Sequence, residues 1–251
     1  MKVLIPLIAY GGMCHVEFAM SLMSLVMKMR DEDIEASIQP ITFESLISRG
    51  RNAAVAYALK GDYSHLLFID SDISFDPDDA IRLLKSGKDV CVGAYPKKYL
   101  SETKMQHIIS NRKYEDWAMN STDFSTELTK KALAEILEGQ KSVETNYAAT
   151  GFMSIKAEVF HSMIEKFPDL KYINDIDGYM GAGDHFYDFF KAGVNPVSKK
   201  YESEDYGFCQ LWRSLGGNIT ILPDITLSHI GKYAFKGNVS SQVRAYVSKN
   251  D

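Results

Sequence analysis

The chain has 251 residues, of which 45% are hydrophobic and 24% are charged. This length and composition suit one globular domain and exclude a disordered, collagen-like or low-complexity chain. Its 28 basic and 33 acidic residues give a net charge of −5, so the chain lacks the basic excess expected of a protein whose main partner is a nucleic acid.

The first 95 residues alternate between strand and helix patterns. Continuous apolar runs predict strands covered on both faces, and apolar residues at helical spacing predict the helices that cover them. The expected strands are 2–9, 35–41, 65–69 and 89–94, and the expected helices are 16–29, 51–59 and one starting at the N-cap Asp76 with Pro77 in its first turn. This order predicts a mainly parallel central sheet with helices on both faces, which binds ligands at the carboxyl ends of its strands.

The second half is less regular. We expect a helix over 126–139, a strand over 151–156 with a helix over 157–167, a helix over 203–215, short strands over 218–222 and 225–228, and a polar tail over 239–251. The fold class is therefore α/β, a single Rossmann-like domain over 1–251 with a small antiparallel part in its second half. Its parts are a ligand-binding half (1–100), a second half (101–238) and the tail.

The cysteines and the apolar runs bear on the location of the protein. Cys14, Cys91 and Cys209 are far apart and match neither a metal-ligand spacing nor a disulfide framework, so we expect free thiols in a reducing compartment. The apolar start is too short for a signal peptide, and no run approaches the roughly 20 apolar residues of a membrane span. We expect a soluble, cytoplasmic protein.

The run Asp70-Ser71-Asp72 is the strongest chemical signal. Two aspartates at alternate positions directly follow the apolar strand 65–69, and they cannot both be buried without a counter-charge. A hard divalent cation, Mn²⁺ or Mg²⁺, held by carboxylate oxygens would supply that charge, especially if it also binds a diphosphate. The alternative is a loop in which one aspartate caps a turn and the other is solvated.

Several weaker candidates lie elsewhere. Glu204 and Asp205 form a second acidic pair, which a helix N-terminus after Ser203 also explains. His229 follows an apolar strand and is either an imidazole ligand or merely hydrogen-bonded. Lys232 offers positive charge for a phosphate or belongs to a solvated basic stretch.

Arg51 and Asn52 lie at the start of a predicted helix. Their side chains could bind a phosphate, ribose or uracil, although surface residues of a capped helix account for them equally well. No glycine-rich fingerprint for dinucleotide or triphosphate binding follows the first strand.

Taken together, the order of these residues resembles the GT-A glycosyltransferases, which use nucleotide-sugar donors. More narrowly, the runs YGGMCHVEFAMSL, ESLISRGRNAAV, HLLFIDSDISFDP and DVCVGAYPKK resemble glycosyltransferases encoded by tailed phages and large DNA viruses. The resemblance is dense over 1–100, sparse over 101–145, and returns in pieces between residues 150 and 229.

The resemblance implies a metal-dependent transfer of a sugar from a nucleoside diphosphate, with UDP expected, to a hydroxyl of a glycan or glycoprotein. It makes 1–100 the nucleotide-sugar half and 101–238 the acceptor-side half. It implies that Asp72, with Asp70 and His229, binds the metal, and that Asp205, with Glu204, supplies the base if the reaction inverts. The implied donor-binding residues are Leu7, Ile8, Ala9, Tyr10, Arg51, Asn52, Asp70, Ser71, Gly151, Phe152 and Lys232.

Three alternatives stay open at this stage. The D-x-D-x-S run also resembles the nucleophile motif of haloacid-dehalogenase-type phosphatases, in which Asp70 would attack phosphorus and Asp72 would act as acid and base. That motif normally lies on the first strand, whereas here it follows two strand–helix units. A nucleotidyltransferase would need a glycine-rich phosphate loop, which is missing. A non-catalytic nucleotide- or glycan-binding module is the third alternative.

Overall fold

A computed structural model describes residues 1–110, 117–196 and 198–247. Its central sheet consists of β1 (Lys2–Ala9), β2 (Glu35–Thr42), β3 (His65–Ile69), β5 (Val90–Val92), β7 (Val143–Thr145), β9 (Phe152–Lys156) and β12 (Ile219–Ile221). The strand order is β2-β1-β3-β9-β5-β12-β7. β1 pairs in parallel with β2 and β3, and β12 with β5, whereas β9 and β7 run antiparallel to their neighbours. The sheet is therefore mainly parallel, as predicted.

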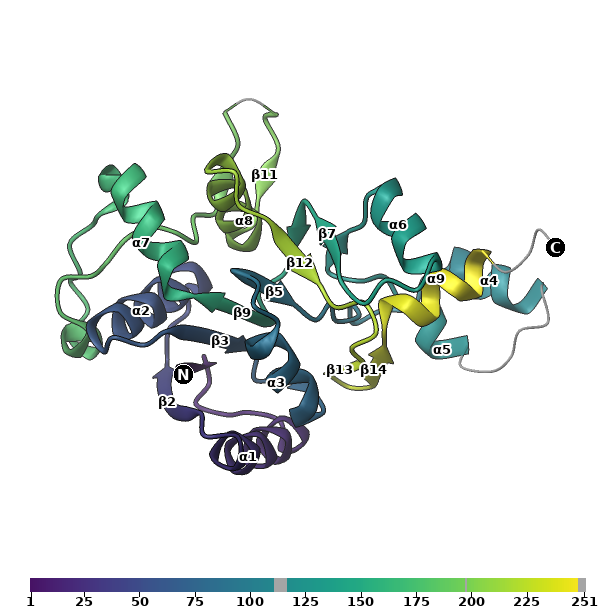
Figure 1. Cartoon of the computed structure of the whole chain (residues 1–251), viewed down its shortest axis with the longest axis horizontal. Helices are drawn as coiled ribbons and strands as arrows, with labels where there is room; N and C mark the ends of the chain where they lie inside the picture. Colours follow the sequence, from purple (N-terminus) through teal and green to yellow (C-terminus); the bar gives the residue numbers. More distant parts are fainter. Residues whose placement is uncertain (111–116, 197, 248–251) are drawn as a thin grey trace.

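Helices cover both faces of this sheet. α1 (Val16–Asp31) and α3 (Pro77–Lys85) lie on one face, and α2 (Ile47–Lys60), α7 (Ala157–Lys166) and α8 (Glu204–Ser214) lie on the other (Figure 1). The period of two along each strand explains the two cores, because successive side chains point to opposite faces. On β3, Leu66 and Phe68 join the core under α2, whereas Leu67 and Ile69 join the core under α1.

Small antiparallel sheets complete the fold, as expected for its second half. β13 (Leu227–Ile230) pairs with both β14 (Ala234–Gly237) and β4 (Ile73–Ser74), β6 (Thr126–Glu127) pairs with β8 (Tyr147–Ala148), and β10 (Gly193–Val194) pairs with β11 (Tyr201–Glu202). The remaining helices are α4 (Glu102–Ser110), α5 (Trp117–Asn120), α6 (Lys130–Leu137), α9 (Val239–Val247) and the short 3₁₀ turns η1 (Pro168–Leu170) and η2 (Asp177–Ala182). α4, α5, α6 and α9 gather beside the β13–β14 hairpin (Figure 1).

The helix ends confirm some sequence predictions and correct others. Asp76 caps α3 as expected, since its Oδ1 accepts from the backbone N–H of Asp78 at 2.9 Å. The helix predicted over 126–139 is shorter, because Thr129 caps α6 through the N–H of Ala132 at 3.1 Å and residues 126–127 form β6.

Other boundaries also differ from the sequence prediction. α2 begins at Ile47 and thus one turn earlier than predicted, and β5 and β12 are shorter than their apolar runs. Most of the predicted polar tail forms α9, whose buried Val239 belongs to the main core, and residues 248–251 lie outside the described residues.

The three cysteines are free thiols, with Cys14 exposed and Cys91 and Cys209 buried. Among the described residues, no helix combines the length and apolar character needed to cross a membrane.

Candidate active site

The backbone after β3 places Asp70-Ser71-Asp72 at the carboxyl edge of the sheet. The N–H of Ile73 donates to the carbonyl of Asp70 at 3.0 Å, which closes a turn, and the N–H of Ile230 donates to the carbonyl of Asp72 at 2.7 Å. β4 then pairs with β13, with Ile73 opposite His229. This pairing brings His229 next to Asp72 although the two residues are far apart in the sequence.

Asp72, His229 and Lys98 form a group that we call the Asp72 group. The Nζ of Lys98 lies 2.5 Å from Oδ2 of Asp72, and Nε2 of His229 lies 3.5 Å from the same oxygen. Burial alone would raise the pKa of Asp72, but the hydrogen bonds from His229 and Lys98 outweigh it and lower that pKa to about 2. Asp72 is therefore a carboxylate throughout the physiological pH range.

The His229 ring is held on its other side by backbone. Its Nδ1 lies 2.9 Å from the carbonyl oxygen of Pro96, and since a carbonyl can only accept, Nδ1 carries the proton. The ring also packs edge-on against Tyr95, with centroids 5.0 Å apart. Nε2 consequently faces Asp72 either as a lone pair that can bind a cation or as the N–H of an imidazolium.

A second group, which we call the Arg51 group, joins three carboxylates to one buried guanidinium. NH1 of Arg51 contacts Oδ1 of Asp205 and lies 3.0 Å from Oε1 of Glu204, while NH2 lies 3.5 Å from Oδ1 of Asp70. Burial raises the pKa of Asp70, and the nearby Arg51 charge opposes that rise. α2, β3 and α8 thus meet at one charged centre.

The side chain of Asp205 is held by groups outside its own helix. The hydroxyl of Thr150 donates to Oδ1 of Asp205 at 2.5 Å, and the backbone N–H of Thr150 donates to the same oxygen at 3.2 Å. Ser203 precedes α8 but makes no side-chain cap bond, so Arg51 and Thr150 position the acid pair. All three contacts fall on Oδ1, which leaves Oδ2 as the oxygen that can take a proton.

Residue 151 must be glycine because the side chain of Asp70 lies too close to leave room for a Cβ. A Cβ at this position would lie 2.5 Å from Oδ2 of Asp70 and 2.6 Å from Cε1 of Tyr95, both closer than real Cβ contacts. The N–H of Asp70 also donates to the Gly151 carbonyl at 2.9 Å. The neighbouring Phe152 is buried, with its ring 5.1 Å from that of Phe75, so the structure gives it a packing role.

Two exposed aromatic side chains mark the ends of β1 and β2. Ala9 is buried and Leu7 and Ile8 are half-buried, whereas Tyr10 is 67% exposed. Phe43 is 76% exposed and has φ of 60°, a region that non-glycine residues seldom adopt. Its N–H donates to the Tyr10 carbonyl at 3.1 Å, so both rings lie at the same sheet edge as Asp70.

Three other predicted donor residues are placed differently from the two groups. Nδ2 of Asn52 donates to Asp188 at 3.0 Å, and Oδ1 of Asn52 accepts from the Phe190 N–H at 3.0 Å, so this amide holds a loop. Ser71 accepts the His15 N–H on its carbonyl at 3.0 Å. Lys232 is exposed in the turn between β13 and β14. Donor contacts for all three stay predictions.

Sequence reasoning missed Lys98 and Phe43 as site residues. Lys98 follows β5 in the run Tyr95-Pro96-Lys97-Lys98, and the only available signal was a lysine pair after a strand that ends at the ligand-binding edge. Phe43 follows β2 in the same way. Both signals depend on knowing which strand ends meet, and the sequence alone does not supply that.

The predicted metal set is brought together only in part. Within the described ranges, no three His, Cys, Asp or Glu side chains are grouped so that they could hold a metal ion by themselves. Asp72 and His229 face each other, whereas Asp70 is paired with Arg51. Arg51 and Lys98 supply counter-charge that the sequence argument had assigned to a cation, and a metal at this site stays a prediction.

Some solved structures resemble this chain at low sequence identity. No family model matches the chain, and no curated protein matches it. Among solved structures, S. aureus TarS 1–349 is similar with a TM-score of 0.40 and 13% identity, over 97% of this chain and 62% of that one. TarS 1–349 in complex with UDP gives 0.37 and 13%, over 94% and 60%.

A third solved structure is the 4-diphosphocytidyl-2C-methyl-D-erythritol synthase from Anaerococcus prevotii. It matches with a TM-score of 0.33 and 8% identity, over 86% of this chain and 96% of that one. At such identities these likenesses concern the fold alone, and the chain spans less than two thirds of the TarS structures. Any statement about activity must therefore come from the side chains of the site.

Proposed function

We propose that the protein is a glycosyltransferase that moves a sugar from a nucleoside-diphosphate donor, with UDP expected, to a hydroxyl of a glycan or glycoprotein acceptor. The observation that carries the proposal is that the Asp72 group and the Arg51 group lie at the same sheet edge. Asp72 faces His229 and Lys98, and Arg51 ties Asp70 to the acid pair Glu204 and Asp205. Such an edge is where α/β sheets bind nucleotides.

The donor fits this edge in charge and in shape. The exposed rings of Tyr10 and Phe43 offer faces for a nucleobase. Lys98 provides a cation beside Asp72 for the diphosphate. The overall charge of −5 is no obstacle, because local cations at the site decide how an anionic donor binds.

The residues around Asp72 partly fit a divalent cation. Asp72 and His229 would be its protein ligands, with Nε2 oriented by the Nδ1–Pro96 hydrogen bond, as second-shell contacts orient histidine ligands. A set of one carboxylate oxygen and one imidazole nitrogen suits Mn²⁺ better than Mg²⁺, which prefers oxygen ligands alone. The bound cation would stabilise negative charge on the diphosphate leaving group.

The acid pair supplies the remaining chemistry if the reaction inverts. The acceptor oxygen forms a bond to the anomeric carbon as the bond from that carbon to the diphosphate oxygen breaks, and the electron pair leaves with the diphosphate. The acceptor proton passes to a carboxylate, for which Oδ2 of Asp205 is suited because the contacts with Arg51 and Thr150 fall on Oδ1. Arg51 holds this carboxylate in place.

The decisive experiment is a donor screen by thermal shift, with UDP-sugars in the presence and absence of Mn²⁺, followed by transfer assays. We expect a metal-dependent rise in the melting temperature with at least one donor, because a ligand that binds the folded state stabilises it. Asp72→Ala should abolish both that rise and transfer. The proposal is wrong if Asp72→Ala leaves both unchanged.

The same preparations distinguish the alternative activities. Phosphate release from simple esters with an aspartyl adduct on Asp70 would indicate a phosphatase. Pyrophosphate release from a nucleoside triphosphate and a sugar phosphate would indicate a nucleotidyltransferase. Donor binding without hydrolysis or transfer across many acceptors would indicate a binding module.

A further inference from the structure

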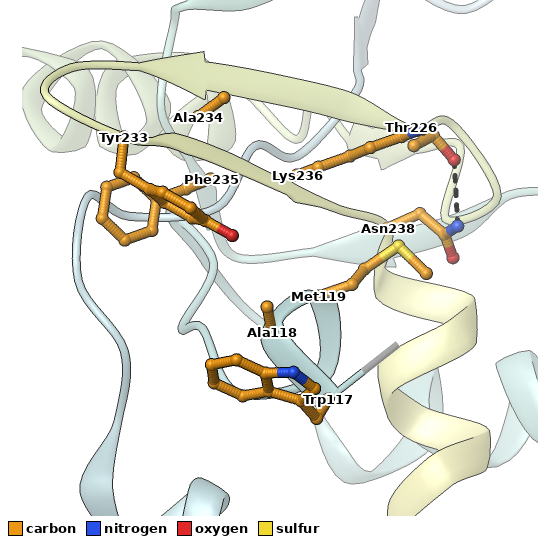
Figure 2. A pocket seen from close by; sticks show the side chains of 9 residues that line it. All are labelled: Trp117, Ala118, Met119, Thr226, Tyr233, Ala234, Phe235, Lys236 and Asn238. Atoms are coloured by element: carbon orange, nitrogen blue, oxygen red, sulfur yellow. Dashed lines mark hydrogen bonds between the residues drawn. The ribbon is translucent and has the colours of Figure 1, made fainter. Parts of the chain in front are cut away.

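Two cavities in the second half of the molecule have exposed aromatic side chains in their lining. Their volumes are about 540 Å³ and about 620 Å³. The larger is lined by Tyr147, Tyr201 and Tyr206, and we call it the tyrosine cavity. The smaller lies between α5 and the β13–β14 hairpin. In Figure 2, Trp117 lies on one side of it and Tyr233 and Phe235 on the other. Either volume could take a sugar ring or two.

The tyrosine cavity lies beside the first turn of α8, the helix that carries the acid pair. Ser203 and Tyr206 line it, and in the first turn of α8 they flank Glu204 and Asp205 directly. Tyr147 on strand β8 packs its ring against the ring of Tyr206, with the two centroids 4.8 Å apart. Glu204 and Asp205 do not themselves line the cavity, but the helix turn that carries them forms part of its wall through Ser203 and Tyr206.

The lining of the cavity matches the chemistry of a saccharide. The Tyr147 and Tyr206 rings and the 75% exposed Tyr201 offer flat apolar faces with hydroxyls at their edges. Glu202 accepts hydrogen bonds from Gln210 at 3.0 Å and from Asn195 at 3.1 Å, which fixes a row of polar groups beside those faces. Apolar faces combined with fixed polar groups suit a sugar ring, which presents C–H groups on its faces and hydroxyls around its rim.

We propose that the tyrosine cavity binds a sugar ring of the acceptor glycan beside the turn of α8 that carries Glu204 and Asp205. The inference rests on the proposed function for the identity of the reaction, but the binding of a saccharide here does not require a donor or a metal. The Trp117 cavity, whose lining does not flank the acid pair, serves as the comparison site.

The test measures saccharide binding first, with a glycan array that covers hexose, deoxyhexose and hexosamine termini, on protein free of donor and metal. For the glycan bound best, titration should give affinities about tenfold weaker for Tyr206→Ala and Tyr201→Ala, the loss expected for one aromatic stacking contact. Tyr206→Phe keeps the ring and should bind nearly as the wild type does, which separates stacking from a folding defect. Tyr233→Ala, in the Trp117 cavity, should bind unchanged.

The second readout is kinetic. In transfer assays, Tyr206→Ala should raise the KM for the acceptor about tenfold while the KM for the donor changes by less than twofold. Absence of binding to any glycan on the array, unchanged affinity in both alanine variants, or loss of affinity in Tyr233→Ala instead would each overturn the inference. If saccharides bind as expected but no donor is bound or turned over, the proposed function fails and the saccharide site stands.

Discussion

The Arg51 group and the Asp72 group lie side by side at one sheet edge, yet different kinds of positive charge balance them. Arg51 is buried and contacts three carboxylates from β3 and α8. Asp72 is balanced by the exposed Lys98 and the half-buried His229. A buried guanidinium is permanently charged and cannot leave, whereas the exposed ammonium of Lys98 can exchange partners. The first group thus holds its acids in fixed positions, whereas the second contains a cation that can move, as the proposed function requires of a ligand site.

The largest expected effect comes from removing the fixed cation. Arg51→Met would leave Asp70, Glu204 and Asp205 clustered without compensation, and breaking a buried ion pair in this way costs about 3–5 kcal/mol. We expect the free energy of unfolding, measured by urea denaturation at pH 7, to fall by that amount. Arg82→Met is the matched control, because Arg82 pairs with Asp79 and Asp224 near the surface and should cost at most about 1 kcal/mol. Equal losses in the two variants would contradict the view that burial makes the Arg51 pairs more important for stability than an ion pair near the surface.

Gly151→Ala tests how closely the Arg51 group is packed. The added Cβ would collide with Asp70 Oδ2 and Tyr95, and overpacking of this kind costs about 1–3 kcal/mol. We expect a loss of stability within that range together with a larger loss of transfer activity, because Asp70 must shift away from Arg51. Gly178→Ala controls for added backbone stiffness alone, since a Cβ there meets nothing within 4 Å and its φ is not positive. Full activity in Gly151→Ala would show that the position of Asp70 is unimportant.

Glu44, which pairs with Arg49, offers a second fixed ion pair outside the two groups, and its behaviour with pH extends the comparison. Burial raises the pKa of Glu44. Hydrogen bonds from Arg49, the Leu46 N–H and Tyr179 lower it by more, so the net shift of the pKa is downward. A carboxyl with a lowered pKa in the folded state stabilises the fold above its unfolded pKa and loses that contribution as the pH falls through its folded-state pKa.

The corresponding variant is Glu44→Gln. It should be less stable than the wild type by about 1–3 kcal/mol at pH 7, and the difference should shrink as the pH falls below the ordinary glutamate value of 4.5. Unfolding free energies from pH 7 to pH 3 measure this. A difference that stays constant across the range would show that the Glu44 charge has no part in it.

The sequence predicted the strand end that carries Asp70 and Asp72 better than it predicted which strands and side chains lie next to it. The apolar run of β3 ending in two aspartates marks a strand end, and the two-residue period of its side chains predicts two cores. The antiparallel insertion of β9 between β3 and β5 was not predicted, because a buried apolar run has the same pattern in either direction. Arg51 was read as either a ligand contact or a surface residue, since charged side chains are rarely buried. Its partner Asp205 is 154 positions away, beyond the reach of any local pattern.

The last prediction has the smallest expected effect on stability and is the sharpest test of the Asp72 group. It asks whether Lys98 or Lys232 binds the diphosphate of the proposed donor. The sequence pointed to Lys232, whereas the structure places Lys98 on Asp72 and leaves Lys232 exposed in a turn. Lys98→Met should change the free energy of unfolding by less than about 1 kcal/mol, because its ion pair is half-exposed.

The same variant should weaken donor binding about tenfold at low salt and less at high salt, as expected for a partly screened charge. Titration with UDP and Mn²⁺ at two ionic strengths, on Lys98→Met and Lys232→Met in parallel, measures both effects. If Lys232→Met shows the larger loss of donor affinity, Lys232 in the β13–β14 turn binds the diphosphate, and Lys98 only neutralises Asp72. If Lys98→Met shows it, the cation that balances Asp72 in the free protein is also the one that the donor uses.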